Sequence, residues 1–180
     1  MKTLLLASLC VAALALTACD KKPNEAPASS AATSASPAGT QPATAALSTN
    51  NIKDIKNDLI ESQTLSQNRS KEALDLQNKA NQAAQKNDKV ALNTIVAEMK
   101  TYIANFNRDL DALALKSTEL DKVRSKIKES NNLGIELSEE SIAEKPDMKK
   151  IAELRDRATQ LQKELVADMQ ALENKVKTAQ

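Results

Sequence analysis

Histidine and tryptophan are absent from this 180-residue chain, which also has one tyrosine (Tyr102), one phenylalanine (Phe106) and two glycines. Because histidine is the commonest general base and metal ligand, its absence argues against the usual nucleophilic catalysis and against zinc, copper and haem sites. Two aromatic side chains are too few to form a stacking platform for nucleobases. We expect no enzyme activity, no metal, no cofactor and no small-molecule substrate, although the sequence leaves a Ser–Lys or paired-carboxylate constellation open.

The chain also has no large excess of positive or of negative charge. The chain has 25 basic and 24 acidic side chains, for a formal net charge of +1. A nucleic-acid binder would show a basic stripe, so the balance argues against nucleic acid as a partner. The carboxylates between positions 136 and 147 lack the alternate spacing and glycine turn of a calcium loop, and helix-dipole complementation on a solvated surface explains them better.

What the chain does have begins at its N-terminus. A positive start, Met1-Lys2-Thr3, precedes an apolar run from Leu4 to Leu16, which is too short to cross ~30 Å of hydrocarbon and is typical of a secretory signal peptide. The four residues Leu16-Thr17-Ala18-Cys19 end this segment. They resemble the lipobox of bacterial lipoproteins. The resemblance implies that residues 1–18 are removed and that Cys19 is acylated and held in the membrane.

Several consequences follow from that resemblance. Cys10 leaves with the signal peptide, so the mature chain keeps only Cys19 and can form no internal disulfide. An ordinary signal peptide cleaved after Ala18, which would leave Cys19 free, is the alternative. We expect the anchor at the periplasmic face of the outer membrane. Asp20 keeps the inner membrane open, because in enteric bacteria Asp at this position tends to retain lipoproteins there.

Residues 19–48 comprise the lipidated cysteine and a stretch rich in Ala, Ser, Thr and Pro. It has too few large apolar residues to offset the entropy of ordering, so we expect a disordered tether. A flexible coil of that length reaches roughly 30 Å.

Apolar residues recur at steps of three and four through residues 49–180, which is the pattern of amphipathic helices. We expect helices at about 50–86, 88–131 and 146–178. Asn50 or Asn51 can cap the first helix and Asp88 the second, Gly134 can end the second, and Pro146 fits the first position of the third. Short connections predict an all-α, antiparallel three-helix bundle of coiled-coil type, preceded by the signal peptide and the disordered linker.

Three residues are candidates for binding a partner protein. Tyr102 and Phe106 lie four apart on one helix face, and aromatic residues are enriched in binding hot spots. Core packing is the alternative that we favour for them. Arg69 sits at a seam position and can form a polar layer that opens to a partner, or extend its head to water along its apolar stem. The second reading of Arg69 is the commoner one.

The sequence thus indicates a lipid-anchored cell-envelope protein that presents a non-enzymatic helical bundle for protein–protein interaction or a scaffold role. The first helix has a seam of small and polar residues, so a protein partner or self-association can complete it. A periplasmic helical chaperone, or a sequestering, inhibitor or immunity protein with a specific envelope partner, is the alternative. An envelope hydrolase is the remaining one.

Overall fold

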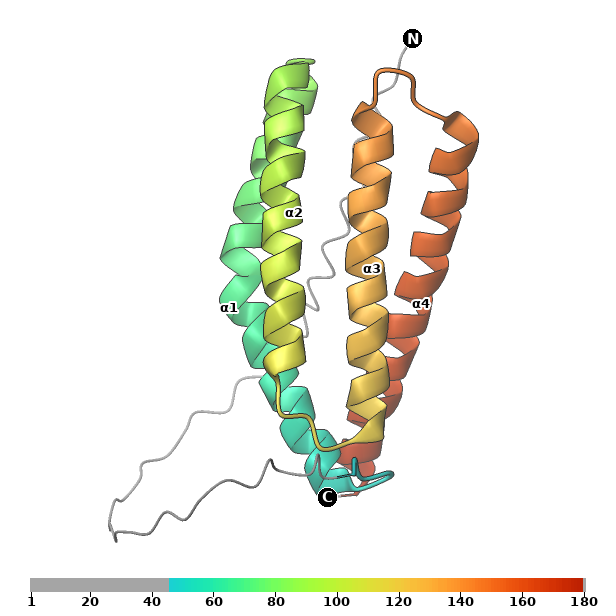
Figure 1. Ribbon diagram of the computed structural model, residues 1–180. Coiled ribbons are helices and arrows are strands. Elements are labelled where there is room, and N and C mark those ends of the chain that lie inside the picture. Colours follow the sequence, from blue (N-terminus) through green and yellow to red (C-terminus); the bar gives the residue numbers. More distant parts are fainter. Residues whose placement is uncertain (1–45, 180) are drawn as a thin grey trace, which may run out of the picture. The chain divides into compact units, whose positions relative to one another are not determined.

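The computed structural model describes residues 46–179, which contain four α-helices: α1 (Ile52–Gln85), α2 (Lys89–Ala112), α3 (Thr118–Ile142) and α4 (Met148–Thr178) (Figure 1). Successive helices are antiparallel. One end of the bundle holds the start of α1, the connection between α2 and α3, and the end of α4; we call this end the base. We call the opposite end the tip. The all-α prediction is confirmed, but the predicted number of three helices is wrong. The signal peptide and most of the tether lie outside the described residues.

The turn between α1 and α2 lies at the predicted position. The side chain of Asn51 accepts hydrogen bonds from two backbone N–H groups at the start of α1, and Asp88 caps α2 by accepting one from Ala91. Asn87 adopts a left-handed φ of 53°, and its N–H donates to the carbonyl of Ala84 at 3.1 Å. Asparagine tolerates this conformation better than most residues, which explains why the chain reverses here.

The predicted helix 88–131 is interrupted, and this is the main correction. Helix α2 ends at Ala112, and Ser117 caps the new helix α3, with its hydroxyl accepting from the N–H of Leu120. The intervening residues include no glycine or proline. The break therefore depends on contacts made from elsewhere in the chain.

The expected end of this helix is also displaced. Helix α3 continues through Gly134, which has no left-handed φ, and ends at Ile142. Asp147 rather than Pro146 marks the start of α4, because its carboxylate accepts from the N–H groups of Lys149 and Lys150.

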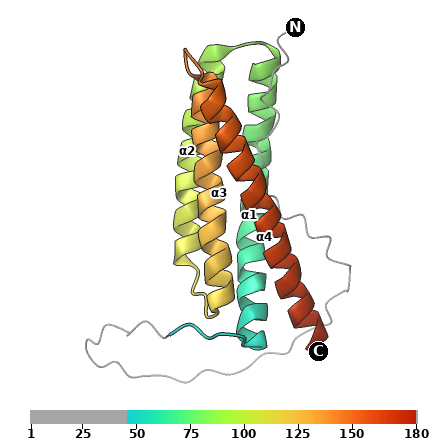
Figure 2. The same cartoon turned by 90° about the vertical axis from the view of Figure 1, so that its right-hand side faces the viewer.

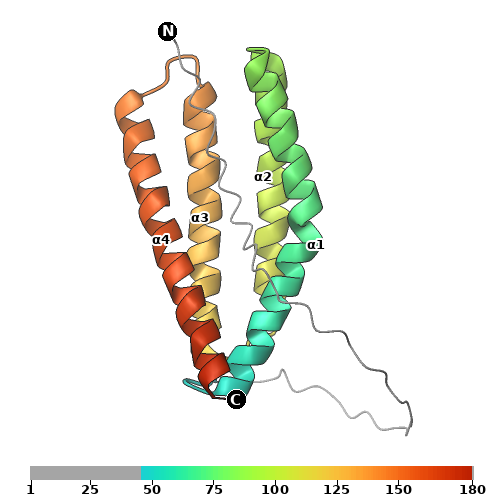
Figure 3. The same cartoon turned by 180° about the vertical axis from the view of Figure 1, so that it is seen from behind.

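The helices form two hairpins, α1–α2 and α3–α4, which contact each other mainly through α2 and α3. Helix α1 packs on α2, α3 packs on α4, and α1 also contacts α3 and α4. Figure 3 shows that α1 and α4 lie close at the base and diverge toward the tip. Figure 2 shows that α4 runs obliquely to the other three helices. The buried α1 side chains toward the tip are mostly alanines, packed against larger residues of α2: Ala73, Leu76, Ala80, Ala83 and Ala84 against Leu92, Ile95, Met99 and Tyr102.

None of the four helices that the structure describes is long and apolar enough to span a membrane.

Candidate functional site

The middle of the α1–α2 hairpin brings together the three residues that the sequence suggested as partner-binding. The rings of Tyr102 and Phe106 stack on α2 with centroids 6.1 Å apart and an angle of 6° between their planes. Tyr102 is 6% exposed, as core packing predicts, whereas Phe106 is only partly buried. The Tyr102 hydroxyl donates to the backbone carbonyl of Arg69 on α1 at 3.4 Å.

Arg69 links the two helices electrostatically. Its Nε donates to Asp109 Oδ2 on α2 at 3.1 Å and its Nη1 to Glu72 at 3.1 Å. The hydrogen bond with Asp109 is the main cause of a raised Arg69 pKa, against the opposing effect of burial. The side chains of Arg69 and Asp109 are each 28% exposed, so solvent screens the pair. Instead of extending freely into water, the guanidinium is held at the seam by two carboxylates.

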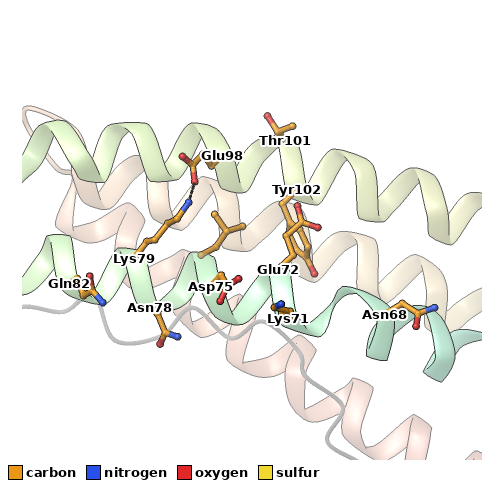
Figure 4. A pocket seen from close by; sticks show the side chains of 11 residues that line it. Asn68, Lys71, Glu72, Asp75, Asn78, Lys79, Gln82, Glu98, Thr101 and Tyr102 are labelled. Atoms are coloured by element: carbon orange, nitrogen blue, oxygen red, sulfur yellow. Dashed lines mark hydrogen bonds and ion pairs between the residues drawn. The ribbon is translucent and has the colours of Figure 1, made fainter.

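Beside this cluster lies a groove on the side of the hairpin turned away from α3 and α4 (Figure 4). Its volume is about 820 Å³. We call it the hairpin groove, and most of the residues that line it are polar: Asn68, Lys71, Glu72, Asp75, Leu76, Asn78, Lys79, Gln82, Glu98, Thr101 and Tyr102. A smaller hollow of about 450 Å³ lies between α3 and α4 and is also mainly polar.

The chemistry of the hairpin groove is a mixture of both charges and neutral amides. Lys79 donates to Glu98 Oε2 across the groove at 2.8 Å, and this bond raises the Lys79 pKa. Burial raises the pKa of Tyr102 above its ordinary 10.0. The groove thus combines many hydrogen-bond donors and acceptors with the apolar stems and rings of the side chains that carry them. Such a mixed lining is like that of protein–protein interfaces.

Sequence reasoning missed a second polar cluster, at the base. Asp58 of α1 is 1% exposed, and its Oδ2 accepts from the N–H and the hydroxyl of Ser117 at 2.7 and 2.6 Å and from the N–H of Lys116 at 3.0 Å. Asp58 lies three residues after Ile55, in phase with the apolar seam. A carboxylate at a seam position was therefore the sequence signal that could have revealed this cluster.

The incoming chain is fixed at the same point. The N–H of Ser48 donates to the carbonyl of Lys116 at 2.7 Å, and the N–H of Thr118 donates to the carbonyl of Ser48 at 2.9 Å. The segment before α1 therefore docks on the α2–α3 connection. Together with Asp58, it explains why α2 stops where it does.

Within residues 46–179, no group of three or more carboxylate, cysteine or histidine side chains is placed to hold a metal ion. Cys19 and Asp20 lie outside the described residues.

A lipobox-like N-terminus followed by an all-helical domain defines the class of protein, a lipoprotein with a helical bundle. A family model described as "Uncharacterised lipoprotein PM1805" matches residues 44–177, and the chain belongs to this family. The match covers the helices and not Cys19, so it supports the lipoprotein prediction independently of the N-terminal motif. Membership indicates a membrane-anchored envelope protein. No curated protein and no solved structure matches this chain.

Proposed function

We propose that this protein is a lipid-anchored, non-enzymatic envelope protein whose helical bundle binds another protein through the hairpin groove. The observation that carries the proposal is the groove itself. Its lining combines three carboxylates, two lysines and several neutral amides on two adjoining helices, with the ring of Tyr102 beneath them. Complementary charges across an interface give specificity and register more than raw affinity, and this lining can supply both.

The placement of the groove supports the same interpretation. The chain enters the bundle at the base, where Ser48 is bonded to the α2–α3 connection. The groove residues of α1 begin at Asn68 and extend toward the tip. A partner can therefore occupy the groove without displacing the segment that leads to the tether.

Site-specific photo-crosslinking in intact cells tests this proposal. A photoreactive amino acid replaces Gln82, which is exposed and lines the groove, in the full-length chain. The matched control places it at Lys163, which is also an exposed position, on α4. We expect a discrete adduct with one heterologous protein from position 82 and none from position 163. No adduct from position 82, or the same adducts from both positions, would contradict the proposal.

The anchor is tested separately. We propose that acylated Cys19 holds the mature chain at the periplasmic face of the outer membrane, with the inner membrane as the alternative suggested by Asp20. Cys19→Ala should move the protein from the membrane fraction to the soluble fraction. Density separation of the two membranes, compared between the wild type and Asp20→Ser, then identifies the membrane. Failure of the wild-type protein, but not of a known lipoprotein, to incorporate labelled palmitate would refute lipid anchoring.

Exposed apolar side chains at the tip favour a second candidate function, a chaperone that shields apolar segments. Val90 and Met148, in the first turns of α2 and α4, are 78% and 62% exposed. Suppression of aggregation of an unfolded outer-membrane protein, lost in the double variant Val90→Ser, Met148→Ser, would support this function. No suppression at equimolar ratio would exclude it.

A further inference from the structure

A second stripe of evenly spaced residues follows the outer surface of α1. Its steps alternate three and four, the interval of a heptad seam: Ile60, Gln63, Gln67, Ser70, Leu74, Gln77 and Asn81. The two large aliphatic members, Ile60 and Leu74, are 52% and 56% exposed. The inner seam of α1, which includes Ile55 and Ala73, is buried on a different face. We call this surface the outer stripe.

Between Ile60 and Asn81 the outer stripe carries no charged residue, and Lys56, one step of four before Ile60, ends the neutral stretch. Exposed faces of helices usually carry charges, and the neighbouring face of α1 has Lys71 and Asp75. A neutral stripe of Gln, Asn, Ser and aliphatic side chains packs against an identical stripe without burying a charge. We propose that two copies of this chain associate through their outer stripes as a parallel pair of α1 helices.

The spacing makes the stripe self-complementary across a two-fold axis. Ile60, Gln67, Leu74 and Asn81 recur every seven residues, so in a parallel pair each meets the same residue of the second copy. Leu74 then packs on Leu74, while the carboxamides of Gln67 and Asn81 hydrogen-bond with their counterparts. Polar residues at such seam positions fix register and oligomeric state at some cost in stability.

The anchor sets the direction of the pair, and this step rests on the proposed lipid anchoring. Two copies held in one membrane both receive their tether at the base, so their α1 helices point the same way. The stripe is about 32 Å long at ~1.5 Å per residue and, at a width of ~10 Å, covers roughly 300 Å² per copy. Stable interfaces bury about 800 Å² per partner, so the pair is weak in solution and depends on confinement to the membrane.

Disulfide trapping tests the pairing, since the mature chain has no cysteine besides Cys19. Gln67→Cys and Leu74→Cys are made in the full-length anchored protein and oxidised mildly in native membranes. The control is Asp75→Cys, which is exposed on the next residue of the same helix but lines the hairpin groove. We expect covalent dimers at positions 67 and 74, at least tenfold more than at position 75. Equal yields at 67 and 75, or an adduct with a different protein at 67, would overturn the inference.

A second variant tests whether the disulfides come from a specific pair rather than from random collisions between copies in the membrane. Ile60→Lys combined with Gln67→Cys places like charges opposite each other in the pair, without touching the buried seam, and should lower the dimer yield at least fivefold. Helicity measured by circular dichroism should stay unchanged. An undiminished yield contradicts the pairing. Because the photo-crosslink at Gln82 reports on a different face, loss of the dimer with retention of that heterologous adduct refutes the inference alone.

Discussion

Asp58 shows how one buried side chain holds the connection between two helices of this bundle. A carboxylate that is 1% exposed is costly to bury unless every lone pair finds a donor. Here the N–H of Lys116 and both the N–H and the hydroxyl of Ser117 supply those donors. The same bonds hold the α2–α3 connection against α1, so they offset both the desolvation of Asp58 and the entropy lost in ordering a segment that contains no glycine or proline.

Removing this carboxylate should destabilise the protein strongly. Asp58→Ala leaves buried donors without an acceptor, so we expect the free energy of unfolding to fall by about 3 kcal/mol. Asp58→Asn keeps one acceptor oxygen and should lose less. Urea unfolding followed by circular dichroism measures both. The control Asp75→Ala, on the exposed face of the same helix, should change the free energy by less than about 0.5 kcal/mol. A similarly small effect of Asp58→Ala would show that these bonds are dispensable.

Glu119, at the base end of the bundle, makes the stability of the fold depend on pH. Burial by itself would raise its pKa, but hydrogen bonds from the N–H of Asn50 at 2.8 Å and from Thr118, with the charge of Lys175, lower it from the ordinary 4.5. A lowered folded-state pKa means that the charged form stabilises the fold. That contribution is fully present above pH 4.5 and is lost as the pH falls through the folded-state value.

Glu119→Gln should therefore destabilise the protein at pH 6 and have much less effect at pH 3. Urea midpoints of the wild type and the variant at both pH values measure the difference. Glu61→Gln, an exposed position on α1, serves as the control for general acid effects. A difference between wild type and Glu119→Gln that is the same at both pH values would mean that this carboxylate is not the titrating group.

At the scale of elements, local signals predicted what local contacts determine. The caps Asn51 and Asp88 and the turn at Asn87 were visible because each acts within a few residues. The break after Ala112 was not predicted, because Asp58 and Ser48, which bond the α2–α3 connection, lie more than 50 residues away in sequence. Local reasoning also placed a helix end at Gly134, where the helix continues and the partly buried Ile135 and Ile142 pack against the core of the α1–α2 hairpin.

In the candidate site too, features within one helix could be predicted from the sequence and contacts between helices could not. Tyr102 and Phe106 could be placed on one face from their spacing alone, and the structure stacks their rings. The partner of Arg69 could not be predicted, because its pairing with Asp109 depends on how far α1 is shifted along α2. The hairpin groove depends on that same shift. Periodicity gives the face of each helix but not the register between two helices.

The α1–α2 turn allows a direct test of conformational strain. Asn87 has φ 53°, where a side chain with a β-carbon is disfavoured and glycine is not. Asn87→Ala should lower the free energy of unfolding by about 1 kcal/mol, while Asn87→Gly should leave it unchanged or raise it slightly. Thermal or urea unfolding of the two variants, compared with the exposed neighbour Lys86→Ala, gives the measurement. Equal effects of alanine and glycine at position 87 would contradict a left-handed turn.

The whole molecule combines a well-buried base with two hairpins of unequal packing toward the tip. In the α1–α2 hairpin, buried residues continue to the turn, including Ala83, Ala84 and Leu92. In the α3–α4 hairpin, no residue of the described chain between Leu133 and Ile151 is buried. The ion pair between Lys150 and Glu140 bridges this end at 2.8 Å, but exposed pairs contribute little.

Amide hydrogen exchange should therefore reveal one labile end. Local opening costs least where few apolar contacts are lost, so amides from about 136 to 150 should exchange at least tenfold faster than those from 80 to 96, at the same end of the bundle. Peptides covering 118–130, next to Asp58 and Ser117, should be the slowest of α3. Mass spectrometry of the intact mature chain resolves these segments. Equal protection of 136–150 and 80–96 would show that the two hairpins open as one unit, with burial along α3 having no separate effect on local stability.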